Sequence, residues 1–358
     1  MESTKHFSPD SEAGLLDYRL PPELIAQTPA PVRDESRLMI VDRASGDLHH
    51  ARFGDLAAWL PPGALLVAND SKVIPARLHG RKIGSGGAVE ALLLGVGDGT
   101  DTRALALTRS SKGLRAGQSL AFAQGITAVV DGVVEQGRCV LDFAPHTVAR
   151  VLALIGELPL PPYIHRPDGP SPQDVERYQT VYARSPGSVA APTAGLHFTR
   201  DLLERLQSHG FEFTKVTLHV GPGTFIPVRG SLSHHHMEEE HFEIGQEAAE
   251  KIRGARGDGI PVVAVGTTAV RALEGSLQDR TCGEAIAQAG VGRTSLFIQP
   301  GYRFQLVDGL VTNFHLPGST LLALVMALAG EGLVRRAYET AVAERYRFYS
   351  FGDAMLIR

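Results

Sequence analysis

The sequence changes its periodicity twice, and these two changes limit the folds open to the chain. Between about residues 63 and 145, short β-like runs follow one another across Gly-rich turns, and no helical pattern intervenes. Several short strands at close spacing predict a small antiparallel barrel or sandwich. On either side, apolar strands alternate with amphipathic helices, which is typical of a layered α/β sheet. We therefore predict a discontinuous α/β domain, residues 15–62 plus 146–358, with a small antiparallel β-barrel domain, residues 63–145, inserted into it.

The individual elements follow from apolar spacing and from Gly, Pro and capping residues. Before the predicted insertion, we expect a hairpin at residues 37–53 and a short helix at 53–60. After it, helices are expected at residues 146–158, 174–183, 199–210, 245–257, 267–277, 319–330 and 332–348. Strands are expected at residues 188–192, 211–220, 261–266, 294–301, 304–314 and 353–358. Residues 1–14 are polar and without periodicity, which predicts a disordered lead.

Composition excludes several classes of protein. The net charge of −4 argues against a generally basic nucleic-acid binder, so any RNA surface must be a local patch. The two cysteines, Cys139 and Cys282, exclude a disulfide scaffold and a thiolate metal cluster and fit a reducing cytosol. The N-terminus lacks the apolar core of a signal peptide, and the apolar run at residues 321–330 is too short to span a bilayer. We expect a cytoplasmic protein without membrane contact.

Polar residues gather where the predicted strands end. His197, His219, Thr267 and His315 lie just after such strands or near their ends, and ligands of open α/β sheets collect at the carboxyl ends of strands. The helix that follows the strand at 261–266 would offer backbone N–H groups to an anion such as a carboxylate. Two alternatives stay open. Thr267 or Thr268 fits a plain N-cap equally well, and a single histidine is more often a hydrogen-bonded structural residue than a catalyst.

The phosphate-binding and metal patterns are weak or missing. The sequence contains no GxxxxGK[ST], and no GxGxxG follows a predicted strand. The run SHHHMEEEHFEI at residues 233–244 suggests a metal site, but neighbouring residues point in different directions and the helical HExxH spacing is missing. We interpret the run as a charged loop that contacts RNA or substrate, with metal binding as the alternative, and we predict no metal site.

Two segments carry local positive charge. The first holds Lys72, Arg77, Arg81 and Lys82, and its charges either guard a strand edge or contact phosphates. In the second, basic residues are interleaved with tyrosines, a composition that suits exposed bases as well as backbone phosphates. The basic residues of the second segment are Arg166, Arg177 and Arg184.

The chain resembles the S-adenosylmethionine:tRNA ribosyltransferase-isomerase family of queuosine biosynthesis. The resemblance rests on seven motifs that occur in family order from about residue 17 to residue 357: YRLPPELIAQTPAPVRDESRL, LLVANDSKVIPARLHGRK, YQTVYARSPGSVAAPTAGLHFT, LHVGPGTFIPV, VVAVGTTAVRALE, LFIQPGYRFQLVDGLVTNFHLPGSTLL and YRFYSFGDAMLI. The family's usual HxMHxE departs here, because Glu238 stands in the second His position; this argues against an essential histidine at that position. The barrel segment matches poorly after about residue 98.

The resemblance implies a reaction in which S-adenosylmethionine donates its ribosyl group. The ribosyl moiety moves to 7-aminomethyl-7-deazaguanine at the wobble position of tRNA and is isomerised, which gives epoxyqueuosine-tRNA and releases adenine and methionine. S-adenosylmethionine is then a consumed co-substrate, and no cofactor is expected. The partners are the tRNA and S-adenosylmethionine, and we expect a monomer. The two basic segments become the predicted tRNA contacts.

The implied reaction needs a base beside the sulfonium, an acid for adenine and a neutral tRNA amine. Histidine suits such proton transfers, so we expect His197, His219 and His315 as catalytic residues, with their individual roles open, and Asp70 as the residue that orients a histidine or the ribose hydroxyls. Glycines would let the backbone approach the ligand, and the threonines that follow Gly266 would hold the methionyl carboxylate. The predicted substrate-binding residues are Thr193, Gly195, Gly221, Gly223, Thr267, Thr268 and Asn313.

Two other functions stay open. One is a non-catalytic RNA-binding protein built on the β-rich segment, which would not consume S-adenosylmethionine. The other is a metal-dependent hydrolase that uses the histidine run, which a metal assay on chelator-treated protein would reveal.

Overall fold

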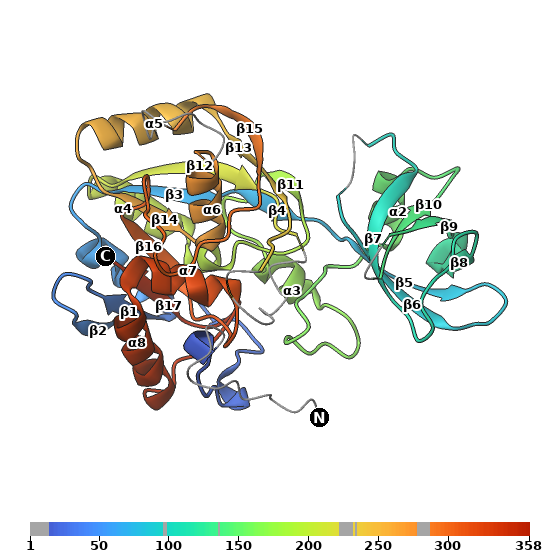
Figure 1. The fold of residues 1–358 in the computed structure, drawn as a ribbon, viewed down its shortest axis with the longest axis horizontal. Coiled ribbons are helices and arrows are strands. Elements are labelled where there is room, and N and C mark those ends of the chain that lie inside the picture. The colour runs from blue at the N-terminus through green and yellow to red at the C-terminus, as the bar shows by residue number, and fades with distance from the viewer. Residues whose placement is uncertain (1–13, 96–98, 135–136, 222–231, 233–234, 278–286) are drawn as a thin grey trace.

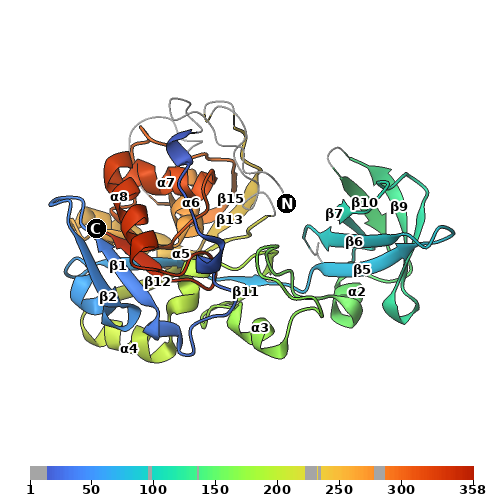
Figure 2. The same ribbon diagram turned by 90° about the horizontal axis from the view of Figure 1, so that it is seen from below.

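The structure, a computed structural model, describes residues 14–95, 99–134, 137–221, 232, 235–277 and 287–358. The N-terminal lead expected at residues 1–14 lies, apart from Gly14, outside the described residues. An α/β body contains most of the chain, and a smaller β-barrel stands to one side of it (Figure 1; Figure 2). The fold class predicted from the periodicity is therefore confirmed.

Nine strands form the sheet of the α/β body. Their order across the sheet is β15 (Gly290–Thr294), β13 (Glu240–Ile244), β12 (Glu212–Leu218), β3 (Leu65–Asn69), β14 (Val262–Val265), β16 (Gly309–Asn313), β17 (Ala354–Ile357), β1 (Arg37–Val41) and β2 (Leu48–Arg52). Strands β12, β3, β14 and β16 are parallel, so their carboxyl ends meet at one edge of the sheet. The hairpin β1–β2 forms as predicted.

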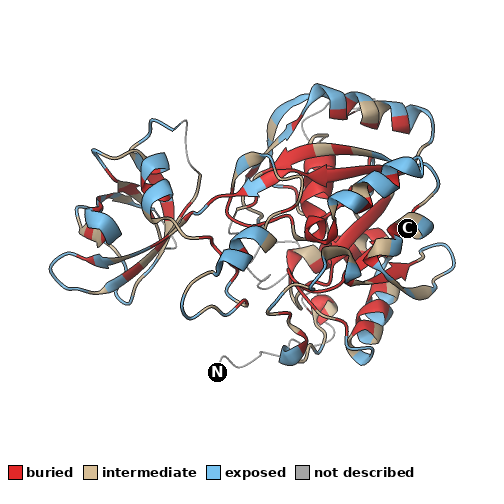
Figure 3. Cartoon of the chain, turned by 180° about the vertical axis from the view of Figure 1, so that it is seen from behind, coloured by how far each residue is buried: buried red, intermediate tan, exposed pale blue. Residues whose placement is uncertain are grey.

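Helices cover both faces of this sheet. Because side chains alternate along a strand, Leu65 and Val67 of β3 join the cluster beneath α5 (Gln246–Gly257), α6 (Thr267–Gly275), α7 (Thr320–Ala329) and α8 (Glu331–Ala343). Leu66 and Ala68 of the same strand pack instead with α1 (Leu56–Trp59) and α4 (Arg200–Ser208). In Figure 3 the central strands are accordingly buried along their length.

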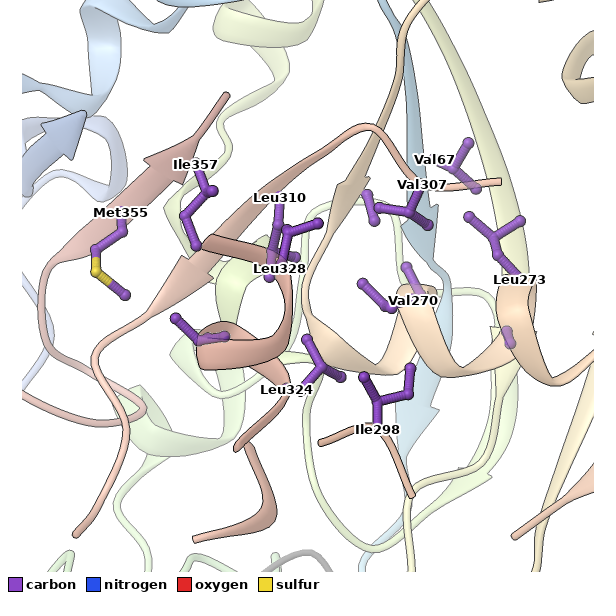
Figure 4. Packing of buried hydrophobic residues seen from close by; sticks show 14 of the residues in the cluster. Val67, Val270, Leu273, Ile298, Val307, Leu310, Leu324, Leu328, Met355 and Ile357 are labelled. Carbon is purple, nitrogen blue, oxygen red and sulfur yellow. The ribbon is translucent and has the colours of Figure 1, made fainter. Parts of the chain in front are cut away.

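The larger of these two core layers is apolar throughout. Figure 4 shows side chains of α6 and α7, among them Val270 and Leu324, gathered against Val67 and Leu310 of the sheet. Each side chain of this size contributes about 1.5–3 kcal/mol when it is fully buried. This packing fixes the helix N-termini and strand ends that form the candidate site.

Six antiparallel strands close the barrel, in the order β10 (Arg138–Asp142), β7 (Arg103–Arg109), β6 (Ala88–Leu93), β5 (Arg77–Lys82), β8 (Ser119–Phe122) and β9 (Thr127–Val133). Within the described part of residues 76–130, the single helical element is a 3-10 turn at Ala123–Gly125. The expectation of a helix-free β segment is thus confirmed. Helix α2 (Val148–Ile155) packs its buried face into the barrel core.

The predicted start of the insertion at residue 63 is wrong for its first strand. β3, which we assigned to the barrel, lies at the centre of the large sheet between β12 and β14. The reason is its composition: all five residues of β3 are buried, as a central parallel strand requires. β4 (Ser71–Val73) also stays with the α/β body and pairs with β11 (Ser185–Ser188).

The chain enters and leaves the barrel at a narrow neck. Arg77 and Glu157 exchange both of their backbone hydrogen bonds, at 3.0 and 2.9 Å. A Cβ at Gly156 would lie 2.1 Å from the Pro75 carbonyl oxygen, so only glycine lets the two crossings lie this close.

Other elements differ in extent from the prediction. The strands expected at residues 188–192 and 294–301 form earlier, as β11 and β15, and α3 (Pro172–Arg177) is shorter than expected. Residues Thr193–His197 form a 3-10 turn that leads into α4. Within the described ranges, none of the helices combines the length and the apolar character that crossing a bilayer would require.

Candidate active site

A pocket opens at the edge where the parallel strands end. Four chain segments line it, each following a strand or a strand end: residues 190–194, Val220, residues 266–268 and residues 312–317. Tyr163, Ser319, Leu321, Tyr349 and Ser350 complete the wall. The predicted site residues on this wall are Thr193, Thr267, Thr268, Asn313 and His315. Five residues from three separate motifs thus lie together.

The N-terminus of α6 forms one side of the pocket. The helix begins at Thr267 after Gly266, whose φ of +89° favours glycine. The N-cap residue is Gly266 and no side chain of the described residues caps the helix, so the plain N-cap interpretation of the two threonines is wrong. Instead, the Thr268 hydroxyl oxygen accepts a hydrogen bond from Asn69 Nδ2 at 3.1 Å. The first N–H groups of α6, which have no partner within a helix, are therefore available to an anion.

His315 is the predicted catalytic residue that lines the pocket itself. Its Nε2 lies 2.8 Å from Thr312 Oγ1, and its backbone N–H donates to the Tyr338 hydroxyl at 3.0 Å. Burial lowers the pKa of His315 to about 3. The ring is consequently neutral at pH 7.

His197 lies behind the pocket wall. Its ring is stacked on Phe53 with centroids 4.9 Å apart, and its two ring nitrogens lie 2.7 Å from Ser36 Oγ and 3.0 Å from Asn313 Nδ2. Burial, followed by the nearby Arg33 and Arg347, lowers the pKa of His197 to about 3. The residue is 4% exposed and is not among the pocket-lining residues. Its geometry is that of a hydrogen-bonded residue that supports Asn313.

His219 and Asp70 lie near each other, and neither is among the lining residues of the pocket. His219 Nδ1 is 3.0 Å from Ser71 Oγ, and burial and the neighbouring His241 lower the pKa of His219. Asp70 is fully buried; it accepts a hydrogen bond from Thr217 Oγ1 at 2.6 Å and lies 3.1 Å from Arg184 Nε. Asp70 therefore holds the segment before β11, and the structure does not bring it to His197 or His315.

Two of the predicted glycines contact groups of the protein itself. A Cβ at Gly195 would lie 2.1 Å from the Tyr182 hydroxyl oxygen, so packing against the protein already requires glycine there. Gly221 donates its backbone N–H to Glu240 Oε1 at 3.2 Å. Gly223 lies outside the described residues.

Six of the seven predicted tRNA-binding side chains have a hydrogen bond or an ion pair within the described part of the protein, and four of the six are partly or fully buried. Arg77 pairs with Glu90 and donates to the Leu160 carbonyl at the barrel neck, and Lys82 donates to the Gly113 carbonyl. In the second segment, Arg166 forms a two-point ion pair with Asp174, with both distances 2.8 Å.

Arg177, the fourth, donates to the Ala30 and Pro31 carbonyls. Lys72, Arg81 and Arg184 are exposed, although Arg81 donates to the Gly86 carbonyl at 3.2 Å and Arg184 pairs with Asp70.

The acidic part of the histidine run also serves the structure. Glu238 pairs with Arg138 of the barrel, Glu239 pairs with Arg293, and the buried Glu240 pairs with Arg271 of α6. The described residues contain no group of three or more His, Cys, Asp or Glu side chains arranged to hold a metal ion. His234 lies outside the described residues.

The sequence did not single out several residues of the site. Tyr163 and Tyr349 stack with ring centroids 4.4 Å apart and line the pocket. Tyr349 has a φ of +72°, which is rare for a tyrosine and marks a constrained position. Both tyrosines stand outside the strand-end pattern that selected the candidates. Ser36, which contacts His197, comes from the N-terminal part of the chain, more than 150 residues away.

These features define an α/β protein with a small-ligand pocket at the carboxyl edge of its sheet and a barrel inserted beside it. The chain belongs to the family described as "Queuosine biosynthesis protein", whose model matches residues 14–357. The resemblance inferred from the seven motifs is thereby confirmed.

Two curated relatives and one solved structure extend this result. Proteins named S-adenosylmethionine:tRNA ribosyltransferase-isomerase are 53% identical over 345 residues in Anaeromyxobacter sp. (strain Fw109-5) and 51% identical over 344 residues in Symbiobacterium thermophilum. Each alignment covers 95% of this chain, and 97% and 98% of the respective relative. The crystal structure of S-adenosylmethionine tRNA ribosyltransferase from Thermotoga maritima matches with a TM-score of 0.54 at 38% identity, covering 96% of this chain and 100% of that one.

Proposed function

We propose that this chain is an S-adenosylmethionine:tRNA ribosyltransferase-isomerase. It transfers the ribosyl moiety of S-adenosylmethionine to 7-aminomethyl-7-deazaguanine at the wobble position of tRNA and isomerises it, which yields epoxyqueuosine-tRNA, adenine and methionine. The observation that carries this proposal is the pocket. Separate motifs of the family bring Thr193, Thr267, Asn313 and His315 to one wall at the carboxyl edge of the sheet, where α/β proteins bind their ligands.

The pocket offers partners for each part of S-adenosylmethionine. The N-terminus of α6, with Thr267 and Thr268 on the wall, suits the methionyl carboxylate. The stacked pair Tyr163–Tyr349 and Phe314 form an aromatic wall that suits the adenine ring and the faces of the ribose. The same aromatic side chains suit the sulfonium, because a cation is attracted to the face of an aromatic ring.

His315 is the best-placed group for proton transfer. The sulfonium acidifies the adjacent carbon, and a neutral imidazole at the pocket wall can remove a proton there and start the loss of adenine. Nδ1 of His315 has no hydrogen-bond partner among the described residues, and Nε2 is held by Thr312. The imidazolium formed in this step can return its proton to the departing adenine. His219 stays a weaker candidate, because it lies outside the lining residues.

The tRNA surface lies on the barrel in this proposal. Arg81 on β5 and Arg109 on β7 point outward, and the loop after β7 carries the exposed Lys112 and Arg115. These four side chains make no ion pair within the described part of the chain. Lys82 holds the same loop by donating to the Gly113 carbonyl at 2.5 Å. On this face, Glu90 pairs with Arg77, and Glu157 lies 3.5 Å from His79. Unpaired surface cations of this kind suit RNA phosphates.

Near the neck, Lys72 and Arg184 extend the basic surface toward the α/β body. They sit on neighbouring segments, since Lys72 is opposite Pro186 in the β4–β11 pair. The wobble base would then enter the pocket while the barrel binds the backbone of the stem. We propose further that the protein acts as a cytoplasmic monomer and needs no cofactor, with S-adenosylmethionine as a consumed co-substrate.

The experiment that tests this function measures adenine release. Purified protein is incubated with S-adenosylmethionine and tRNA that carries the aminomethyl base, and adenine and modified tRNA are quantified. Release that depends on the modified tRNA supports the proposal. tRNA binding without consumption of S-adenosylmethionine would point to a non-catalytic RNA-binding protein. Activity that is lost on chelation and restored by a divalent ion would point to the metal-dependent alternative.

A further inference from the structure

We propose that Asn313 Oδ1 is the acceptor that the pocket offers to an N–H or O–H donor of bound S-adenosylmethionine, and that His197 is a positioning residue that fixes the orientation of this amide. The inference rests on the proposed function and deepens it. It replaces the expectation that His197 is itself an acid or base.

The backbone carbonyl of Tyr349 determines which groups donate and which accept in the hydrogen bonds around Asn313. A backbone carbonyl oxygen can only accept a hydrogen bond, so the Asn313 side-chain atom 3.2 Å from the Tyr349 carbonyl must be Nδ2. The same Nδ2 lies 3.0 Å from His197 Nε2, which must therefore accept. The proton of the neutral His197 ring is then on Nδ1.

The next two hydrogen bonds agree with this assignment. His197 Nδ1–H donates to Ser36 Oγ at 2.7 Å, and the Ser36 hydroxyl donates in turn to the Arg33 carbonyl at 3.2 Å. Every donor along this path meets an acceptor, from Arg33 to Tyr349. Reversing the Asn313 amide would place its oxygen against the Tyr349 carbonyl and would leave His197 Nε2 without a donor.

The network leaves one buried acceptor open. Asn313 is 2% exposed and lines the pocket, and its Oδ1 has no hydrogen-bond partner among the residues that the structure describes. A buried polar atom without a partner is costly unless a ligand or water satisfies it. S-adenosylmethionine carries three kinds of donor, namely the adenine amino group, the ribose hydroxyls and the ammonium of its methionine part. The shared chemistry is one N–H or O–H aimed at this oxygen.

His197 has no free nitrogen with which to transfer a proton. Both of its ring nitrogens are occupied by Ser36 and Asn313, and its face is covered by Phe53. Its effect on the reaction therefore passes through Asn313. The expected consequence of losing it is weaker binding of S-adenosylmethionine, because the freed amide can turn its NH2 group into the pocket.

The first test reads the tautomer in the wild-type protein. Nitrogen-15 NMR of histidine-labelled wild-type protein reports the tautomer of each ring, and the His197 signal is assigned by its loss in the His197→Gln variant. We expect the neutral Nδ1–H tautomer for His197 at pH 7. An Nε2–H tautomer, or a protonated ring, would overturn the proposal. This result does not depend on the reaction. Failure of the protein to bind S-adenosylmethionine would contradict the proposed function and would leave the tautomer assignment unaffected.

The second test compares two amides at position 197. Glutamine places an acceptor where Nε2 lies, whereas asparagine reaches only the Nδ1 position. We expect His197→Asn to weaken S-adenosylmethionine binding roughly 3- to 10-fold, and His197→Gln to restore most of that affinity, with the pH profile of kcat unchanged in both. His209→Gln, an exposed histidine at the end of α4, is the matched control. Equal affinity in the Asn and Gln variants, or loss of one limb of the pH profile, would contradict the positioning role.

The source of the donor is resolved with ligand analogues. S-adenosylmethionine analogues that lack the adenine amino group, one ribose hydroxyl or the ammonium group are titrated against wild type and Asn313→Ala. The group that meets Oδ1 is the one whose removal weakens binding to wild type several-fold more than binding to the variant. If all three analogues lose affinity equally in both proteins, Asn313 Oδ1 is not the acceptor.

Discussion

The pocket edge of the large sheet and the outer face of the barrel use polar residues in opposite ways. At the pocket, the polar side chains are buried, uncharged and tied to one another, as in the pair His197–Asn313. On the barrel, Arg81, Arg109 and Lys112 are exposed and have no acidic partner within the described residues. The pocket thus holds its donors and acceptors in fixed directions, whereas the barrel face supplies positive charge.

The contrast suggests how a chain with a net charge of −4 can serve two very different substrates. A small ligand that loses its water needs directed partners at fixed positions. A polyanion is bound by charge at the surface, with little need for fixed geometry. The predictions below test this division, beginning with the largest expected effect.

Loss of His315 should have the largest effect on turnover. His315→Ala removes the neutral imidazole from the pocket wall, and a positioned acid or base is typically worth about 10²- to 10⁴-fold in rate. The measurement is adenine release under saturating substrates, with the melting temperature as a check on the fold and His209→Ala as the control. Turnover near that of wild type would show that the pocket binds without His315 chemistry.

The buried histidines should make the pocket region sensitive to acid. The folded-state pKa of His197 and of His315 is about 3, below the ordinary value of 6.5. Between pH 6.5 and 3 the unfolded chain therefore binds more protons, and stability falls as pH falls. Each histidine should add about 1.4 kcal/mol per pH unit to this loss in the middle of the window.

The check is denaturant unfolding of wild type and of His315→Gln from pH 7 to pH 4. The variant should lose stability less steeply than wild type, whereas equal slopes would mean that His315 is protonated in the folded protein. The other acid-sensitive groups, such as Asp174, are common to both proteins and cancel in the difference.

Arg166 and Arg81 form a matched pair on the two sides of the comparison, since both were predicted to bind tRNA. Arg166 is paired with Asp174, whose side chain is 4% exposed, so Arg166→Ala should lower the free energy of unfolding by about 1–3 kcal/mol. Its tRNA affinity should keep the salt dependence of wild type. A shallower salt dependence would place Arg166 on the RNA instead.

Arg81→Ala and Arg109→Ala should each change the salt dependence of tRNA binding slightly and leave the free energy of unfolding nearly unchanged. Neither side chain stabilises a described ion pair, so the unfolding free energy should change by less than about 0.5 kcal/mol. If each contacts one phosphate, the log–log slope of tRNA affinity against salt becomes shallower by roughly 0.7–0.9. Unchanged slopes in both variants would move the RNA surface away from the barrel.

Some of the predicted site residues line the pocket because they follow strand ends. Thr267 and His315 were selected by that rule, and parallel strands bring such positions to one edge, whereas Thr193 and Asn313 entered through the family resemblance. The rule could not separate His315 from His197, which lies one layer deeper. That difference depends on Ser36, a contact across more than 150 residues that no local pattern encodes.

Charge was predicted less well, for a different reason. The sequence does not indicate whether an arginine side chain faces solvent or donates to a backbone carbonyl. Arg177 is engaged by Ala30 and Pro31, and Arg77 closes the barrel neck, although both stand in basic segments. The same limit applies to β3, because the apolar sequence of a short buried strand is similar in a barrel and at the centre of a large sheet.

The most direct test of the two-region account measures both substrates against two variants. Isothermal titration gives the affinities of S-adenosylmethionine and of tRNA for Asn313→Ala and for the triple variant Arg81→Ala/Arg109→Ala/Lys112→Ala. We predict that Asn313→Ala weakens S-adenosylmethionine binding several-fold and leaves tRNA affinity unchanged, whereas the triple variant weakens tRNA binding and leaves S-adenosylmethionine affinity unchanged. Loss of both affinities in either variant, with the fold intact, would contradict the division of the two substrates between the pocket and the barrel.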